Sequence, residues 1–385
     1  MKKTYLLLIA FVAIVSCSVA DKAHDPLADT GRTKRTENLL VNLKKQAATR
    51  GWMFGHQDDV MYGIGWGGDT ARSDVKSVCG DYPALLSFDL GHLELGDSVN
   101  LDGVPFQRMH DEIVRHFERG GVISLSWHLN NPLTGGTAWI NDSTGEQHLN
   151  TVAAVLEGGE QHDKFLSWLD IVAHFLNSLQ TSDGIHVPVI FRPWHEHTGS
   201  WFWWGQKLCT TEQYKALWKL TVDRLKEQGV VNALYAYSPG TESKGDPEKY
   251  MERYPSDDII DILGLDTYCY APNADTTAIA AYANDLDTHL SMICDLAAKH
   301  DKLAALTETG FESIKTDNWW THTLMPVINR HPISYVVVWR NAHNIPGHFY
   351  APYPGHPSAP DFVEFYNHPR SLFLRDLELK NCKIK

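Results

Sequence analysis

The chain of 385 residues predicts a single (β/α)8 barrel, and two observations carry this prediction. From about residue 36 onward, eight short apolar runs alternate with stretches that carry the apolar periodicity of helices. Most of the runs are continuously apolar rather than alternating, as expected of parallel strands that are covered on both faces. A doubly wound open sheet would show the same alternation and is the structural alternative.

The elements follow from these patterns in chain order. The apolar runs predict strands at Trp52–Gly55, Ala84–Leu90, Val122–Trp127, Val187–Phe191, Ala233–Tyr237, Ile259–Leu265, Leu303–Leu306 and Tyr335–Trp339. Apolar residues three and four positions apart predict helices at 106–118, 163–179, 211–226, 277–299, 318–330 and 359–377, with a shorter helix at 70–78. In the helix at 163–179, for example, Phe165, Leu169, Val172 and Leu176 lie on one face.

The N-terminus resembles a bacterial export signal. Lys2 and Lys3 precede an apolar run from Leu6 to Val15, which is shorter than the roughly 20 residues that span a bilayer. Ile14-Val15-Ser16-Cys17 resembles the lipoprotein box, in which the cysteine is acylated after cleavage. We therefore expect a signal peptide with an acylated Cys17 at 1–17, a polar linker at 18–35 and a catalytic domain at 36–385. Ordinary cleavage near Ala20 is the alternative.

This signal predicts an exported protein that a lipid at Cys17 holds in the cell envelope. No acidic cluster follows Cys17 directly, which favours the periplasm over the cell surface. The formal net charge of −13 repels nucleic acid and acidic polysaccharides, so we expect a neutral polymer as the partner and a monomeric protein. The remaining cysteines, which could form two bridges at most and lack zinc-site spacing, are Cys79, Cys209, Cys269, Cys294 and Cys382.

Polar residues follow most of the predicted strands, where a barrel gathers its functional groups. Two of these strand ends carry glutamates, Glu196 after the fourth strand and Glu308 after the seventh. The two ends would face each other across the mouth of the barrel. Glycoside hydrolysis requires two carboxyl groups, about 5–5.5 Å apart for retention and about 6.5–9.5 Å apart for inversion. The alternative for either glutamate is a structural side chain paired with an arginine or a backbone amide.

The surroundings of the two glutamates predict different charge states. Glu196 lies in the stretch R-P-W-H-E-H-T-G-S-W-F-W-W, in which apolar indoles would favour the protonated acid. Arg340, one strand beyond Glu308, would favour the ionised form of that residue. Neighbouring residues on a strand point to opposite faces, so His195 and Glu196 do not suit one metal ion. We expect no metal and no cofactor, and we expect packing roles for Trp168, Trp203, Trp204 and Trp218.

The ordered motifs G-H-Q-D-D, S-W-H-x-N-N-P, R-P-W-H-E, G-L-D-T-Y, T-E-T-G and V-W-R-N resemble glycoside hydrolase family 26, which consists mainly of β-mannanases. The resemblance implies that Glu196 is the acid/base and Glu308 the nucleophile. It further implies that His195 contacts the region of the sugar 2-hydroxyl and that Tyr268 hydrogen-bonds the nucleophile. The substrate-binding residues that it implies are His128, His195, Trp201, Tyr268, Trp339 and Arg340, with Trp139 as a looser match.

The resemblance implies a retaining mannan endo-1,4-β-mannosidase that cleaves mannan, glucomannan or galactomannan by double displacement. Whether cleavage is internal or releases mannobiose from a chain end stays open, as does the tolerance of galactose side groups. One alternative is the same site acting on mixed-linkage β-glucan or β-1,3-xylan. Another is a non-catalytic surface glycan-binding lipoprotein, which would need the indoles but not the paired glutamates.

Overall fold

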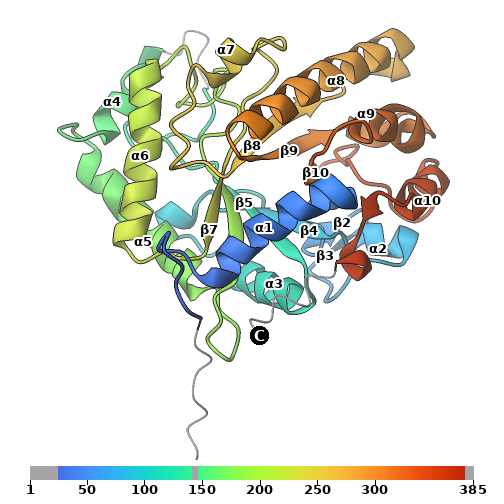
Figure 1. Ribbon diagram of the computed structural model, residues 1–385, viewed down its shortest axis with the longest axis horizontal. Helices are drawn as coiled ribbons and strands as arrows, with labels where there is room; N and C mark the ends of the chain where they lie inside the picture. Colours follow the sequence, from blue (N-terminus) through green and yellow to red (C-terminus); the bar gives the residue numbers. More distant parts are fainter. Residues whose placement is uncertain (1–24, 141–145, 378–385) are drawn as a thin grey trace, which may run out of the picture.

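A computed structural model describes residues 25–140 and 146–377 and contains a closed barrel of eight parallel strands (Figure 1). Each strand pairs with the next along the chain, and the last pairs with the first to close the barrel. The predicted (β/α)8 barrel is therefore confirmed, and the alternative of a doubly wound open sheet is excluded. The strands are β1 (Trp52–Gln57), β4 (Leu85–Asp89), β5 (Val122–Ser126), β6 (Val189–Arg192), β7 (Ala233–Tyr237), β8 (Ile262–Tyr268), β9 (Leu303–Gly310) and β10 (Tyr335–Val338).

Helices surround the barrel, and most lie where the periodicity predicted them. A small hairpin of β2 (Tyr62–Gly63) and β3 (Trp66–Gly67) follows β1. The helices are α1 (Lys34–Thr49), α2 (Asp74–Cys79), α3 (Phe106–Glu118), α4 (Thr151–Val155), α5 (His162–Ser178), α6 (Thr211–Glu227), α7 (Pro247–Met251), α8 (Thr276–Lys299), α9 (Met325–Ile328) and α10 (Ala359–Asn367).

Two of the long predicted helices are shorter or less regular than expected, and a proline accounts for each; the short helix predicted at 70–78 begins only at Asp74. The helix predicted at 359–377 ends at Asn367, because Pro369 disfavours helical backbone at His368. The chain then adds the short strand β11 (Ser371–Leu372) beside β1. The helix predicted at 318–330 begins as a π-helical turn, Trp320–Leu324, before Pro326 in α9, since proline cannot donate a backbone hydrogen bond.

Helix α1 closes the N-terminal end of the barrel (Figure 1). Its Leu39 and Leu43 pack with inward-facing strand residues such as Met53 and Leu303 in one apolar cluster. The described part of the predicted linker, residues 25–35, also packs on the barrel. Arg32 forms a bidentate ion pair with Asp261 at 2.8 and 2.7 Å. The helix therefore begins at Lys34, two residues before the predicted start of the domain, while Cys17 lies outside the described residues.

Within residues 25–140 and 146–377, every helix is too short or too polar to cross a membrane. The four cysteines in these ranges, Cys79, Cys209, Cys269 and Cys294, are all free thiols. Cys382 lies outside the described residues.

Candidate active site

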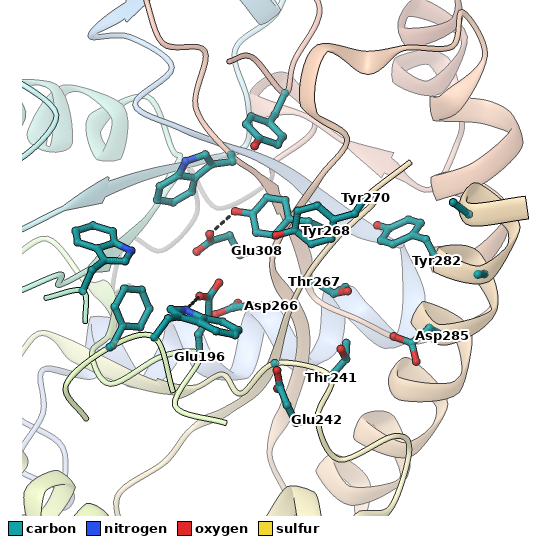
Figure 2. A pocket seen from close by; sticks show the side chains of 18 of the residues that line it. Glu196, Thr241, Glu242, Asp266, Thr267, Tyr268, Tyr270, Tyr282, Asp285 and Glu308 are labelled. Atoms are coloured by element: carbon teal, nitrogen blue, oxygen red, sulfur yellow. Dashed lines mark hydrogen bonds between the residues drawn. The ribbon is translucent and has the colours of Figure 1, made fainter. Parts of the chain in front are cut away.

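A cleft of about 770 Å³ opens at the carboxyl ends of the barrel strands (Figure 2). It brings together seven of the nine residues that the sequence nominated, from the loops after β5 and β6 and from β8, β9 and the end of β10. These seven are His128, Trp139, Glu196, Trp201, Tyr268, Glu308 and Trp339. The other two, His195 and Arg340, do not line it.

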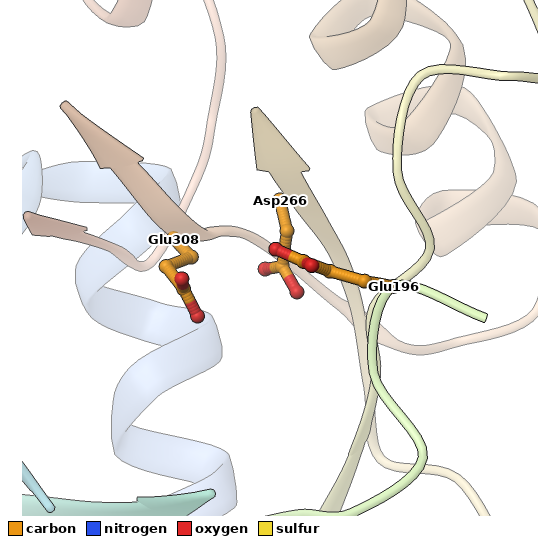
Figure 3. Close-up of side chains that lie close together, drawn as sticks. All are labelled: Glu196, Asp266 and Glu308. Carbon is orange, nitrogen blue, oxygen red and sulfur yellow. The ribbon is translucent and has the colours of Figure 1, made fainter. Parts of the chain in front are cut away.

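A register shift in β9 directs Glu308 into the cleft. Leu265 of β8 pairs with Leu306, but the next residue, Asp266, pairs with Glu308, so β9 contains one extra residue at this point. The pairing of β9 with β10 shifts over the same residues. A bulge of this kind changes which face a side chain occupies. It aligns Asp266 and Glu308 on neighbouring strands, where their carboxyl groups lie close to that of Glu196 (Figure 3).

Arg192, rather than the predicted Arg340, is the cation beside Glu308. Its Nη2 donates to Glu308 Oε2 at 2.5 Å, and the Tyr268 hydroxyl donates to Oε1 of the same carboxylate, as the family resemblance implied. Arg340 instead pairs with Asp102 at 2.8 Å. The prediction failed because Arg192, at the carboxyl end of β6, has a side chain long enough to reach Glu308 on β9.

Glu196, Asp266 and Glu308 each offer an oxygen within 4.8 Å of the others (Figure 3). Such a trio could in principle hold a metal ion. However, Arg192 already supplies a positive charge inside it, donating to Asp266 Oδ2 at 2.6 Å as well as to Glu308. Burial raises the pKa of Asp266 to about 7 against the opposing effect of Arg192. Arg192 therefore already compensates part of the negative charge that would attract a metal ion.

The loop that carries Glu196 has an unusual backbone. Trp194 and Glu196 have φ values of 57° and 51°, in the left-handed region that non-glycine residues seldom occupy. His195 and Glu196 therefore lie in a turn beyond β6, and the strand alternation that we expected for them does not apply. Buried side chains hold this turn. The Trp204 indole donates to the His195 carbonyl at 2.8 Å, and the Tyr214 hydroxyl donates to the Trp194 carbonyl at 2.7 Å.

The four indoles of this loop divide into three that pack and one that is available to a ligand. Trp194, Trp203 and Trp204 are fully buried, whereas Trp201 is 39% exposed and lines the cleft. Trp139, at 38% exposure, faces the same cleft, and its loop pairs with the Trp201 loop through a bridge between Trp139 and Phe202. Outside this loop, Trp168 and Trp218 are buried as expected.

The electrostatic surroundings of Glu196 suit a general acid. Burial, and then the negative charge of Glu308, raise its pKa well above the usual range of a carboxyl group. The direction agrees with the prediction from the indole-rich loop. One indole nevertheless acts in the opposite sense, because Trp201 Nε1 donates a 2.7 Å hydrogen bond to Glu196 Oε2 and so favours the charged form (Figure 2).

One histidine, His128, lines the cleft, and a second, His195, lies behind it. The His128 ring stacks on Trp139 with centroids 5.0 Å apart, and its Nδ1 lies 2.6 Å from Asp89 Oδ2. His195 is only 1% exposed and lies behind His128, with 3.0 Å between their Nε2 atoms. The structure thus places His195 beneath the cleft surface rather than on it.

Several cleft or supporting residues were absent from the nominated set. Arg192, Asp266 and Asp89 all stand at strand ends, so the rule that located the glutamates could also have found them. Tyr270 and Glu242 lie in loops without a recognisable pattern. Only the fold brings them to the cleft.

Two glutamates close together at the mouth of a parallel barrel, Glu308 buried and Glu196 half-buried, beside partly exposed indoles, define a barrel glycoside hydrolase. The comparisons agree with this class. The family model described as glycosyl hydrolase family 26 matches residues 28–308. The chain belongs to glycosyl hydrolase family 26.

Solved structures and curated relatives support the membership. A family 26 β-mannanase from Bacteroides ovatus shares 53% identity with a TM-score of 0.86, over 92% of this chain and 99% of that one. A family 26 protein from Muricauda sp. shares 33% identity with a TM-score of 0.81, over 90% and 93% of the two chains. A mannan endo-1,4-beta-mannosidase from Bifidobacterium adolescentis is 33% identical over 74% of this chain, which spans only 28% of that relative's length.

Proposed function

We propose that this protein is a mannan endo-1,4-β-mannosidase that hydrolyses β-1,4-mannosidic bonds with retention of anomeric configuration. The similarity to β-mannanases supports the substrate. The observation that carries the mechanism is that one oxygen of Glu196 lies within 4.8 Å of one oxygen of Glu308. Carboxyl groups placed this close together suit direct attack by a carboxylate, whereas inversion needs them farther apart to admit a water molecule.

In the first step, a Glu308 oxygen attacks the anomeric carbon while the bond from that carbon to the glycosidic oxygen breaks. The departing oxygen takes the proton of Glu196, whose raised pKa keeps it protonated. In the second step, Glu196 accepts a proton from water, and that water displaces Glu308 from the mannosyl-enzyme. Arg192 and Tyr268 hold the Glu308 carboxylate through both of its oxygens, which orients it for attack.

The cleft walls provide the surfaces for sugar rings. Trp201, Trp139 and Trp339 present indoles that can stack on the apolar faces of pyranoses. His128 lies beside them and can contact hydroxyl groups of the bound sugar. His195 and Arg340 would contribute from outside the cleft lining, His195 through its contact with His128 and Arg340 while paired with Asp102.

Replacing either glutamate tests the assignment. Glu308→Ala and Glu196→Ala should each lower mannan turnover by about three orders of magnitude or more, while circular dichroism shows a folded protein. Glu312→Ala, which removes an exposed glutamate from the end of the same barrel, should leave turnover unchanged. Near-normal activity in either catalytic variant would contradict the proposal. So would α-anomers among early products in NMR.

A polysaccharide panel separates the alternatives. Hydrolysis of mixed-linkage β-glucan or β-1,3-xylan in preference to mannan would favour the other substrates. Binding to mannan without release of reducing ends would instead favour a non-catalytic glycan-binding protein. Products from manno-oligosaccharides of graded length would distinguish internal cleavage from release of mannobiose.

We further propose that the protein is exported and anchored in the cell envelope by acylation of Cys17, and that it acts as a monomer. The sequence Ile14-Val15-Ser16-Cys17 supports the anchor. Mass spectrometry of the membrane fraction should find a diacylated Cys17 at the new N-terminus. A soluble protein cleaved near Ala20 would contradict the proposal. Light scattering of detergent-extracted protein would test the oligomeric state.

A further inference from the structure

Asp89, at the carboxyl end of β4, is a fully buried carboxylate surrounded by donors. Its Oδ1 accepts from the backbone N–H of Gly91 at 2.7 Å and of His128 at 3.2 Å. Its Oδ2 accepts from Ser126 Oγ at 2.6 Å and lies 2.6 Å from His128 Nδ1. Three donors therefore point at the two oxygens, which favours the ionised form. Although burial opposes it, contact with His128 lowers the pKa of Asp89 to about 2.

This carboxylate fixes one proton of His128. Because Asp89 accepts at Nδ1, that nitrogen must carry hydrogen, and only the state of Nε2 stays open. Nε2 faces Nε2 of His195 at 3.0 Å, so one of the two nitrogens must donate to the other. If His128 donates, it is an imidazolium. If His195 donates, both rings are neutral.

The contacts of His128 favour the first arrangement, whereas His195 is neutral in either one. His195 is buried, and burial lowers its pKa, as do the nearby charges of Arg192 and His128. For His128, burial also lowers the pKa, but the contact with Asp89 outweighs it, and Glu308 adds to the increase. The aromatic neighbours Trp139, Phe202 and Trp339 carry no charge. The ionisable groups that face His128 from β4 and its loop, from β6 and its turn, and from β9 are Asp89, Asp102, Arg192, His195 and Glu308.

We propose that Asp89 is a positioning residue that holds His128 as an imidazolium, with Nδ1–H donated to Asp89 and Nε2–H directed at the neutral His195. A second positive charge, after Arg192, then stands beside Glu308 in the cleft wall. The role of this charge in catalysis rests on the proposed glycosidase function. The contacts among Asp89, His128 and His195 do not depend on the substrate.

Nitrogen-15 NMR of histidine-labelled protein tests the charge state directly in the unaltered chain. We expect His128 to give the imidazolium signature through neutral pH, whereas His195 stays neutral. In Asp89→Asn, His128 should lose its proton at a pH lower by about one unit or more, because an amide does not attract a cation. Ser126→Ala removes one donor to Asp89 but keeps the charge, and should leave the His128 titration nearly unchanged. A neutral His128 in the unaltered protein at pH 6 would overturn the proposal, even if Asp89→Asn did not fold.

Kinetics give the second readout. A dinitrophenyl β-mannobioside has a leaving group that departs without a proton from Glu196. With this substrate, the alkaline limb of the plot of kcat/KM against pH therefore does not report the pKa of Glu196. In Asp89→Asn we expect this limb to move to lower pH and kcat/KM at neutral pH to fall by about 100-fold. Ser126→Ala should keep the limb in place. A folded Asp89→Asn whose limb coincides with the unaltered enzyme would contradict the inference. A folded, unaltered protein that cleaves no mannoside would contradict only the proposed function.

Discussion

At the scale of single residues, two chemically identical glutamates acquire different properties from their neighbours. Glu196 has one hydrogen bond from Trp201 and faces the charge of Glu308, and burial raises its pKa. Glu308 receives a guanidinium N–H and a phenol hydroxyl, one on each oxygen. Donors on both oxygens stabilise a carboxylate, whereas burial beside a like charge stabilises a neutral acid. This contrast underlies the assignment of acid and nucleophile.

The Trp201 hydrogen bond yields a pH prediction. Trp201→Phe keeps an aromatic ring but removes the Nε1–H that lowers the pKa of Glu196. The pKa of Glu196 should therefore rise further, and a general acid with a higher pKa stays protonated to higher pH. We expect the alkaline limb of kcat/KM on mannotetraose to move to higher pH. Trp339→Phe is the matched control, since Trp339 also lines the cleft but the indole that donates to Glu196 Oε2 is that of Trp201. An unmoved or lowered limb in Trp201→Phe would contradict this account.

The sequence located both glutamates because strand ends converge in a barrel whatever their detailed geometry. It did not identify Arg192 as the partner of Glu308, since Arg340 follows the strand next to that of Glu308 and was therefore expected to be the nearer cation. Side-chain reach across the barrel has no signature in sequence spacing. The position of His195 behind His128 was missed for a related reason. It depends on left-handed backbone at Trp194 and Glu196, which local propensity would not predict for either residue.

At the scale of elements, bounds set by local patterns were predicted better than irregularities inside a strand. The helix predicted at 106–118 has those bounds as α3, because its termini follow from local periodicity and turn residues. The bulge in β9 at Thr307 was not predicted. A near-continuous apolar strand looks the same with or without an extra residue, yet this bulge aligns Glu308 with Asp266.

The start of α6 offers a test of local stabilisation. Thr210 and Gln213 form a capping box, in which the Thr210 hydroxyl accepts from the Gln213 N–H and the Gln213 side chain accepts from the Thr210 N–H. Thr210→Ala should lower the free energy of unfolding by about 1 kcal/mol, because it leaves an N-terminal amide without its partner. Urea denaturation would measure the loss. Thr211→Ala, one residue later, should cost less than half as much. Equal effects would show that the cap is not the source of the stabilisation.

At the scale of the whole molecule, the hydrophobic core consists of two clusters, one inside the barrel and one between the barrel and its helices. The alternation of runs in the sequence was sufficient to predict this arrangement. The sequence did not predict that α1 would close the floor of the barrel. Residues 34–49 have a modest apolar stripe, and their role depends on an opening that exists only after the strands have closed.

Buried neutral histidines make the stability of the whole fold depend on pH. His116 is fully buried, and burial lowers its pKa to about 4, below the value near 6.5 expected in the unfolded chain. Between pH 4 and pH 6.5 the unfolded state binds more protons at His116 than the folded state does. The contribution of neutral His116 to the free energy of unfolding is therefore complete above pH 6.5. It falls by about 3 kcal/mol as the pH is lowered towards 4.

Urea midpoints from pH 7 to pH 4 would measure this loss. His116→Gln should flatten the dependence over this window, even if it lowers stability at pH 7. His322→Gln, at an exposed position, should leave the slope as it is. A slope in His116→Gln equal to that of the unaltered protein would show that other groups are responsible.

The pairing of β1 with both β10 and β11 has a consequence for the order of events during synthesis. Residues 52–57 leave the ribosome nearly 280 residues before Tyr335–Val338, the strand that completes their hydrogen bonding. Until then β1 has an unpaired edge, and α1 has no closed floor to cover. A growing chain must therefore keep its first strand from pairing with other chains for most of its translation, which makes residues 52–57 a natural site for chaperone protection.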